Sequence, residues 1–248
     1  MIKLKELMSP LPLNESIYDK GLFKAVFFSG VPGAGKSYTI NKITSGEISP
    51  RIVNTDKFIE FLSKKFGVDV NSDEYYSQFK EKVHTLNKNQ LSLYINEMLP
   101  LFVDGTSNSM ESVFRREGIL KSFGYDVGMV WINTDLNQAI SRAQQRDRYV
   151  PVDFIKKVYN SLAENMVYYK SHFKFFVEIK NSEGELTDSA INSAFKSTSN
   201  FFTSPVDNPV GKKNLELASK TSGRLIPNVK PTLSSISNLL GGWYSSGI

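Results

Sequence analysis

The stretch Gly30 to Ser37, which reads GVPGAGKS, constrains the fold of this chain more than any other feature. It follows the apolar run AVFF and precedes a segment with helical character. Glycines in such a loop let the backbone turn successive N–H groups toward one point, and the helix behind it adds the positive end of its dipole. The spacing G-x-x-x-x-G-K-S between a strand and a helix is typical of a phosphate-binding loop. The stretch therefore predicts a site for the phosphates of a nucleoside triphosphate, in preference to a plain glycine-rich turn.

Two side chains of this loop have specific expected roles. Lys36 is expected to reach the β- and γ-phosphates, and the Ser37 hydroxyl is expected to ligate Mg²⁺. ATP and Mg²⁺ are therefore the expected cofactors. The other loop and first-turn residues expected to contact ATP are Gly30, Gly33, Ala34, Gly35 and Tyr38.

Short β-rich runs alternate with longer helical segments along the chain. Runs such as AVFF and LFV are too continuously apolar for a sheet with one face in water. The alternation predicts an α/β fold of the P-loop NTPase type, with a parallel five-stranded sheet flanked by helices on both sides. The expected strands are Lys24–Ser29, Arg51–Asn54, Pro100–Asp104, Asp126–Asn133 and Lys174–Ile179. The expected helices are Lys36–Thr44, Lys57–Phe66, about 72–98, Met110–Phe123, Leu136–Arg146 and Val152–Lys170.

Composition divides the chain into three parts. Residues 1–20 are expected to form an N-terminal extension, 21–200 a P-loop kinase domain, and 201–248 an irregular tail rich in Ser, Asn and Pro. Apolar residues within 233–243 predict one short amphipathic helix in that tail. A body that ends at residue 200 is expected to keep its turnover without the tail.

Charge and cysteine content narrow the class of protein. The net charge is +5, of which +3 lies in residues 201–248, so a polyanionic partner is permitted but only weakly indicated. The chain has no cysteine, which fits a reducing compartment, and no apolar run approaches the length of a membrane helix. The expected location is the cytoplasm, or the host cytoplasm for a phage-encoded chain, with no membrane partner.

Two aspartates follow predicted strands at the edge where doubly wound sheets gather their sites. Asp56 follows the second strand and is a candidate general base for an acceptor hydroxyl; its alternative role is to cap the next helix. Asp104 ends the third strand and is a candidate for holding the water shell of Mg²⁺; its alternative role is a plain Asp-Gly turn.

Arginines cluster in the stretch ISRAQQRDRYVP. Arg142 and Arg146 lie one helical turn apart, beside an apolar face, and Arg148 follows. One interpretation is a solvated helix face, and the other is a lid that brings guanidinium groups onto the transferring phosphate.

Phosphate loops occur in several classes of protein. The chain has no N-K-x-D motif for guanine and no apolar run that ends in Asp-Glu, so a kinase is favoured over a GTPase or a motor ATPase. The alternative from another class is a nucleotide-binding structural protein whose loop changes conformation and whose tail binds a partner.

The motifs together resemble a known group of kinases. Four motifs occur between residues 23 and 180 in the order seen in bacteriophage polynucleotide 5′-hydroxyl kinases and, more broadly, in zeta-toxin-like P-loop kinases. The motifs are SGVPGAGKS, VNTDKF, VDGTSNSMESVFRR and TDLNQAISRAQQRDRYVPVDFIKKVYNSL. The resemblance implies that Lys36 is catalytic, that Asp56 is the general base and that Arg146 is the lid arginine, with Arg142 and Arg148 as supporting cations on ATP. It further implies a metal site at Ser37 and Asp104, and an acceptor site at Asp56, Lys57, Asp104, Thr106 and Asn108.

Two departures from that family widen the choice of acceptor. The family's acceptor-reading segment carries Asp-x-x-Arg, but Ile59 stands three residues after Asp56, and the phosphatase motif Asp-x-Asp-x-Thr is absent. The expected function is transfer of the γ-phosphate to a hydroxyl of nucleic acid, DNA before RNA, with a polynucleotide 5′-hydroxyl as the leading acceptor. The alternatives are a 5-hydroxymethyluracil DNA kinase of phage DNA hypermodification and a kinase of a nucleotide sugar.

Overall fold

The computed structural model describes residues 20–44, 49–67, 69, 72–146, 149–181 and 187–220. Its strands are β1 (Lys24–Ser29), β2 (Arg51–Val53), β3 (Leu101–Asp104), β4 (Asp126–Asn133) and β5 (Phe176–Lys180). Its helices are α2 (Lys36–Ile43), α3 (Asp56–Phe66), α4 (Asp73–Asn96), α5 (Met110–Ser122), α6 (Leu136–Gln144), α7 (Val152–His172), α8 (Asp188–Thr203) and α9 (Pro209–Ser219). Every expected strand and helix within these residues is present, with ends that differ by no more than two residues.

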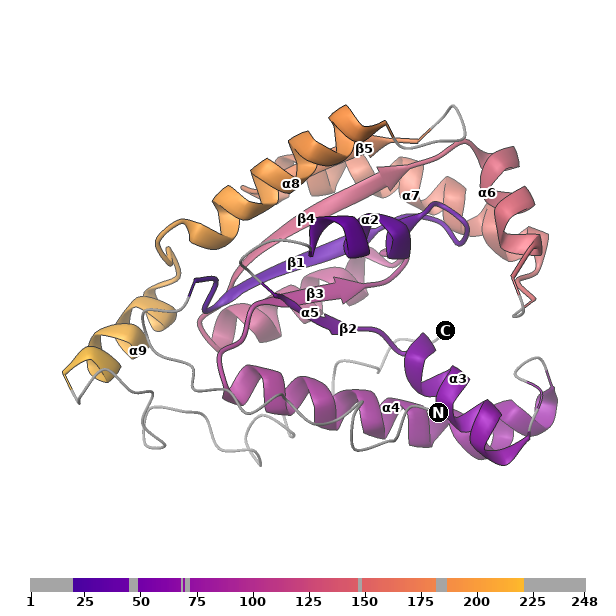
Figure 1. Ribbon diagram of the computed structural model, residues 1–248, viewed down its shortest axis with the longest axis horizontal. Coiled ribbons are helices and arrows are strands. Elements are labelled where there is room, and N and C mark those ends of the chain that lie inside the picture. Colours follow the sequence, from indigo (N-terminus) through magenta and orange to yellow (C-terminus); the bar gives the residue numbers. More distant parts are fainter. Residues whose placement is uncertain are drawn as a thin grey trace.

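The five strands form one parallel sheet in the order β2-β3-β1-β4-β5 (Figure 1). The central strand β1 pairs with β3 on one side and with β4 on the other, so that Phe27 lies opposite both Val103 and Met129. The predicted fold class, a parallel five-stranded sheet flanked by helices, is confirmed.

Helices cover both faces of the sheet, which explains the unbroken apolar runs in its strands. All six residues of β1 are buried, and its Phe28 ring packs against the edge of Phe102 at 4.7 Å. Helices α2 and α8 contact each other on one face, while α7 lies behind the strands in Figure 1. The buried residues of α7 recur every three or four positions and form one apolar stripe, which contains Ile155, Val158, Leu162, Met166 and Tyr169.

Helices α3 and α4 share a small apolar cluster of their own. It contains Phe58, Ile59 and Leu62 of α3 with Phe79 and Val83 of α4, and it is separate from the main core. Ile59, which stands three residues after Asp56, is only 8% exposed and belongs to this cluster. The side chain at that position therefore packs inward and does not face a ligand.

Helices α8 and α9 have no counterpart among the expected helices. Helix α8 runs past residue 201, the predicted start of the irregular tail, and Phe202 within it is 2% exposed and contacts Phe102. Helix α9 begins at Pro209, where the missing N–H of proline costs nothing, and Asn208 caps it with its side-chain oxygen. The prolines at 205 and 209 therefore mark a helix end and a helix start, and ordered structure continues to residue 220.

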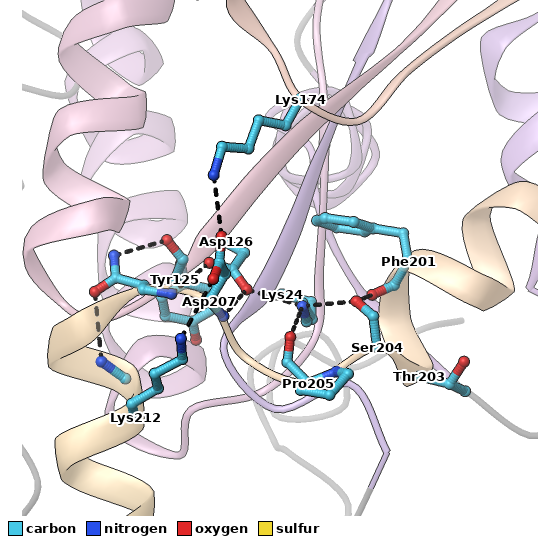
Figure 2. A network of polar contacts seen from close by, with 12 residues as sticks. Lys24, Tyr125, Asp126, Lys174, Phe201, Thr203, Ser204, Pro205, Asp207 and Lys212 are labelled. Atoms are coloured by element: carbon cyan, nitrogen blue, oxygen red, sulfur yellow. Dashed lines mark hydrogen bonds and ion pairs between the residues drawn. The ribbon is translucent and has the colours of Figure 1, made fainter.

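A buried lysine anchors the connection between α8 and α9 to the sheet (Figure 2). Lys24, at the start of β1, is 2% exposed and lies 2.8 Å from the carboxylate of Asp126 on β4. Its ammonium group also donates to Ser204 Oγ and to the Pro205 carbonyl, each at 3.0 Å. All three ammonium protons therefore have acceptors, as a buried charge requires.

The same carboxylate also binds the backbone that leads into α9. Asp126 accepts hydrogen bonds from the N–H groups of Asp207 and Asn208, at 2.7 and 2.8 Å. Asp207 in turn pairs with Lys174 and Lys212, as Figure 2 shows. This network ties the segment 204–212 to the amino ends of β1 and β4.

Three expectations concern the ends of the chain. The extension 1–20 and the amphipathic helix within 233–243 lie almost wholly outside the described residues, and the three-part division of the chain stays a prediction. Within the part of the chain that the structure describes, no helix is long and apolar enough to span a membrane.

We expect Phe202→Ala to lower the free energy of unfolding by about 3–5 kcal/mol, because it empties a core position next to Phe102. Leu217→Ala on α9 is the control, since this side chain is 42% exposed, and a change within about 0.5 kcal/mol is expected. Urea unfolding measures both. For the same reason a chain cut at residue 200 should fail to fold. Equal stability of the two point variants would contradict the assignment of α8 to the core.

Candidate active site

The carboxyl ends of all five strands meet at one edge of the sheet, because the strands are parallel. The residues that directly follow the strands, or end them, are Gly30 after β1, Asn54 after β2, Asp104 in β3, Thr134 after β4 and Asn181 after β5. The loop Gly30 to Ser37 joins β1 to α2 at this edge, as predicted.

The phosphate loop has the backbone geometry that its glycines allow. Gly33 and Gly35 have φ values of +86° and +94°, and Gly35 is the N-cap of α2, so Lys36 is the first helical residue. The Lys36 ammonium group donates to the carbonyls of Gly30 and Val31, at 2.7 and 3.2 Å. The lysine thus folds over its own loop, and Ser37 and Tyr38 are exposed in the first turn of α2.

Gly33 allows the loop to approach helix α6 closely. A Cβ atom at Gly33 would lie 2.1 Å from the carbonyl oxygen of Ala139 in α6. Ala139 and Ala143 are both fully buried and form the face of α6 that meets the loop. The backbone of the loop and the backbone of α6 are therefore in direct contact.

Lys36 lies among three other charged side chains of the predicted site. Burial lowers the pKa of Lys36, Asp104 and Asp56 raise it, and Arg146 lowers it. Each of these groups must be close enough to affect the ammonium charge. The structure therefore brings together Lys36, Asp56, Asp104 and Arg146, which come from four different segments of the chain.

Asp104 is half-buried at the end of β3, and one of its oxygens has no hydrogen-bond partner among the described residues. Burial raises the pKa of Asp104 above its ordinary value, the Asp56 charge adds to this rise, and Lys36, Arg146 and Lys57 oppose it. Its Oδ2 accepts a hydrogen bond of 2.7 Å from Asn54, whereas its Oδ1 is buried without a partner among the described residues. A buried carboxylate oxygen without a donor fits a role in holding a hydrated Mg²⁺ ion.

Asp56 is the first residue of α3, and Thr55 is its N-cap, so the alternative role of Asp56 as the cap is wrong. The Asp56 side chain is exposed, and its backbone N–H donates to Asn54 Oδ1 at 2.7 Å. Its negative charge raises the pKa of both Lys36 and Asp104, so Asp56 lies within electrostatic range of the phosphate loop.

Asn54 is a site residue that the sequence analysis does not name. Its amide group donates to Asp104, and its carbonyl oxygen accepts from the backbone of Asp56, so that it connects two candidate site residues. The available signal is its position directly after β2, at the edge where polar residues collect.

The loop after β3 holds two expected acceptor residues in a fixed arrangement. The Thr106 hydroxyl donates to Asn108 Oδ1 at 2.7 Å, and Asn165 of α7 donates to the Asn108 carbonyl at 2.9 Å. Tyr169 of α7 donates to the carbonyl of Ser107, whose φ is +56°. The loop is therefore held by α7.

The arginines are divided between α6 and the residues after it. Arg142 lies within α6 and is half-buried, and Arg146 follows the end of α6 and is exposed. Arg146 lowers the pKa of both Lys36 and Asp104, so its positive charge lies within electrostatic range of the phosphate loop. Arg148 lies outside the described residues.

A comparison with protein families matches residues 18–193 to the model described as zeta toxin. The chain belongs to the zeta toxin family. The match includes the phosphate loop, both aspartates and α6, and it supports a nucleotide-binding phosphotransferase over a structural protein. A search of curated proteins finds no match.

Solved structures are similar to this zeta toxin family member in fold at low sequence identity. A proposed kinase from Chloroflexus aurantiacus is 11% identical with a TM-score of 0.51, over 71% of this chain and 97% of that one. A structure from the PezAT toxin–antitoxin system of Streptococcus pneumoniae is 20% identical with a TM-score of 0.49, over 83% and 87%. Shikimate kinase from Acinetobacter baumannii is 13% identical with a TM-score of 0.40, over 73% and 93%.

The described residues contain no group of three or more His, Cys, Asp or Glu side chains that would hold a metal ion. The metal site at Ser37 and Asp104 stays a prediction.

We expect Gly33→Ala to weaken nucleotide binding by at least tenfold, since the added methyl group collides with the Ala139 carbonyl and strains a positive φ by about 1–3 kcal/mol. The control is Gly118→Ala in α5, where an added Cβ meets nothing within 4 Å and should stabilise the helix by about 0.5–1 kcal/mol. Titration calorimetry with ATP measures the binding. Normal binding by Gly33→Ala would show that the loop does not need close contact with α6.

We expect Asp104→Asn to stabilise the nucleotide-free protein at pH 8. The pKa of Asp104 is raised on folding, so the protonated carboxyl is favoured in the folded chain, and the free energy of unfolding falls as the pH rises from 3.8 through the folded pKa. The gain in melting temperature should therefore shrink as the pH is lowered toward 4. Asp207→Asn is the control, because Lys174 and Lys212 lower the pKa of Asp207 and its loss should bring no gain. An equal gain at every pH would contradict this account.

Proposed function

We propose that this zeta toxin family member is an ATP-dependent kinase that transfers the γ-phosphate to an alcohol. The observation that supports this function best is the meeting of Lys36, Asp56, Asp104 and Arg146 at the mouth of the phosphate loop. Phosphoryl transfer needs a cradle for phosphates, an acceptor-orienting carboxylate and cations on the transferring group, and these four residues supply each part.

The phosphate loop would hold ATP through its backbone N–H groups, and Lys36 would exchange its bonds to Gly30 and Val31 for phosphate oxygens. A bound Mg²⁺ would neutralise charge on the β- and γ-phosphates, with the Ser37 hydroxyl and Asp104 as the residues that hold it or its water shell. Tyr38, Arg142 and Arg148 are proposed as further contacts to ATP.

Asp56 is proposed as the general base. Its carboxylate is exposed at the start of α3, where an acceptor can reach it, and close enough to Lys36 to face the γ-phosphate. It would accept the proton of the hydroxyl that attacks phosphorus. Asn54 would hold the backbone of Asp56 and the side chain of Asp104 at a set separation.

Arg146 is proposed to stabilise charge on the phosphoryl group in transit. It lies just after α6, is exposed, and acts electrostatically on the same two groups, Lys36 and Asp104. A guanidinium group held by the end of a helix can approach the γ-phosphate as the nucleotide binds.

For the acceptor we propose a hydroxyl on a nucleotide-type molecule, with a polynucleotide 5′-hydroxyl first, because the order of motifs matches such kinases. Lys57, Thr106 and Asn108 would line the acceptor side with Asp56 and Asp104. A hydroxymethyl group on a base in DNA is an alternative acceptor, since its phosphorylation needs the same general base and the same cations.

A nucleotide sugar is the second candidate, and the burial of Ile59 favours it. The residue is 8% exposed within the α3–α4 cluster, so no cation at this position reads a nucleic acid phosphate, and exposed Lys57 is the neighbouring positive charge. Membership of the zeta toxin family is compatible with this acceptor.

The proposal is tested by offering γ-labelled ATP together with 5′-hydroxyl DNA and RNA oligonucleotides, hydroxymethyluracil DNA and nucleotide sugars in parallel reactions. We expect label in one of these acceptors, and a fall in kcat of about 10²–10⁴-fold in Asp56→Asn, with little change in the affinity for ATP. Asp188→Asn is the matched control, because Asp188 is also the exposed first residue of a helix and lies in α8.

The outcome separates the acceptors. Label in oligonucleotides alone supports the polynucleotide acceptor, and label in nucleotide sugars alone supports the second candidate. If no acceptor is labelled, or if Asp56→Asn turns over as fast as Asp188→Asn, the proposed chemistry is wrong.

A further inference from the structure

One carbonyl group on the outer side of the phosphate loop receives two buried hydrogen bonds. Thr134 Oγ1 and Asn181 Nδ2 each donate to the carbonyl oxygen of Ala34, at 3.0 Å. The three residues are between 1% and 3% exposed. Thr134 directly follows β4 and Asn181 directly follows β5, so two strand ends hold one peptide group of the loop.

We propose that Thr134 and Asn181 are positioning residues that set the direction of a phosphate-binding N–H group, an inference that rests on the proposed function of the loop. The carbonyl of Ala34 and the N–H of Gly35 belong to one planar trans peptide, so they point in opposite directions. Holding the carbonyl against the strand ends turns the Gly35 N–H toward the cradle. The two side chains thus set the loop in its phosphate-binding form before the nucleotide arrives.

The glycine at position 35 makes this arrangement necessary. Gly35 has a φ of +94°, a conformation that is open to glycine and gives its backbone wide freedom in the absence of a restraint. The Asn181 amide nitrogen would lie 3.3 Å from a Cβ atom on Gly35, so the asparagine packs closely against this residue. Thr134 and Asn181 supply the restraint that the glycine itself lacks.

Asn181 also carries a cost that packing alone does not explain. Its Oδ1 atom is buried and has no hydrogen-bond partner among the described residues. An unsatisfied buried acceptor destabilises a fold, and an apolar residue of the same shape would avoid this cost. The amide is retained at a site where its donor group is needed on Ala34, as expected for a residue that serves binding more than stability.

Thr134 also links the phosphate loop to helix α6. It precedes Asp135, the N-cap of α6, whose carboxylate accepts from the N–H groups of Asn137 and Gln138. The bond from Thr134 to Ala34 therefore ties the start of α6 to the phosphate loop, next to the contact between Gly33 and Ala139. Movement of one would be transmitted to the other.

The test compares full-length Thr134→Val, Thr134→Ser and Asn181→Leu with the parent. Val removes the hydroxyl but keeps the shape, Ser keeps the hydroxyl, and Leu removes the amide donor. We expect the Kd for Mg·ATP to rise about three- to tenfold in Thr134→Val and in Asn181→Leu, the effect of one neutral hydrogen bond, and to recover in Thr134→Ser. Binding of adenosine, measured by ligand-observed NMR, should stay at the parent value, because adenosine has no phosphate for the loop to hold.

The control is Thr198→Val in α8, which removes a buried threonine hydroxyl that has no partner among the described residues. It should keep the parent Kd for Mg·ATP and an equal or higher melting temperature. If folded Thr134→Val and Asn181→Leu bind Mg·ATP like the parent, or if Thr134→Ser binds as weakly as Thr134→Val, the positioning role is wrong. If Asn181→Leu does not fold, the two Thr134 variants decide. Absence of ATP binding by the parent would instead overturn the proposed function of the loop.

Discussion

Parallel pairing of β1 with β3 and β4 is the constraint on which the rest of the structure depends. Since all five strands run the same way, every strand delivers its next residues to one edge of the sheet. This arrangement brings five residues that are far apart in the sequence to the same edge: Gly30, Asn54, Asp104, Thr134 and Asn181. A sheet with one strand reversed would separate the phosphate loop from Asp104, or from the side chains of Thr134 and Asn181 that bind the Ala34 carbonyl.

The charged pairs at the two ends of the sheet differ in how well protein groups satisfy them. At the carboxyl ends, Lys36 and Asp104 are half-buried, and for each of them desolvation outweighs their mutual attraction, so that each charge is disfavoured. At the amino ends, Lys24 and Asp126 are largely buried, but protein groups satisfy the ammonium group and both carboxylate oxygens. In the first pair Asp104 Oδ1 has no hydrogen-bond partner among the described residues, whereas every charged oxygen of the second pair has one.

Helices α3 and α6 bring the remaining chemistry to the phosphate loop from opposite sides. Helix α6 packs its alanine face directly on the loop, and this contact makes Gly33 necessary. Helix α3 instead packs on α4 in a separate apolar cluster, which takes in Ile59 and leaves Asp56 exposed at its start. The phosphate loop is thus attached to the main core, whereas Asp56 stands on a smaller apolar cluster.

The phosphate loop, the parallel sheet and the two aspartates follow from the sequence, because glycine spacing, continuous apolar runs and positions after strands are local signals. Local signals do not reveal Asn54, Thr134 and Asn181, since a single polar residue after a strand looks the same whether or not it meets a partner 50 to 147 residues away. The structure of residues 201–219 could not be predicted for a similar reason. Prolines in this segment predict an irregular tail, whereas the packing of Phe202 and the hydrogen bonds of Lys24 hold α8 and α9 in place. Sequence by itself determined the type of fold and the phosphate site; only tertiary structure decided which distant side chains meet, because hydrogen bonds and burial depend on neighbours in space.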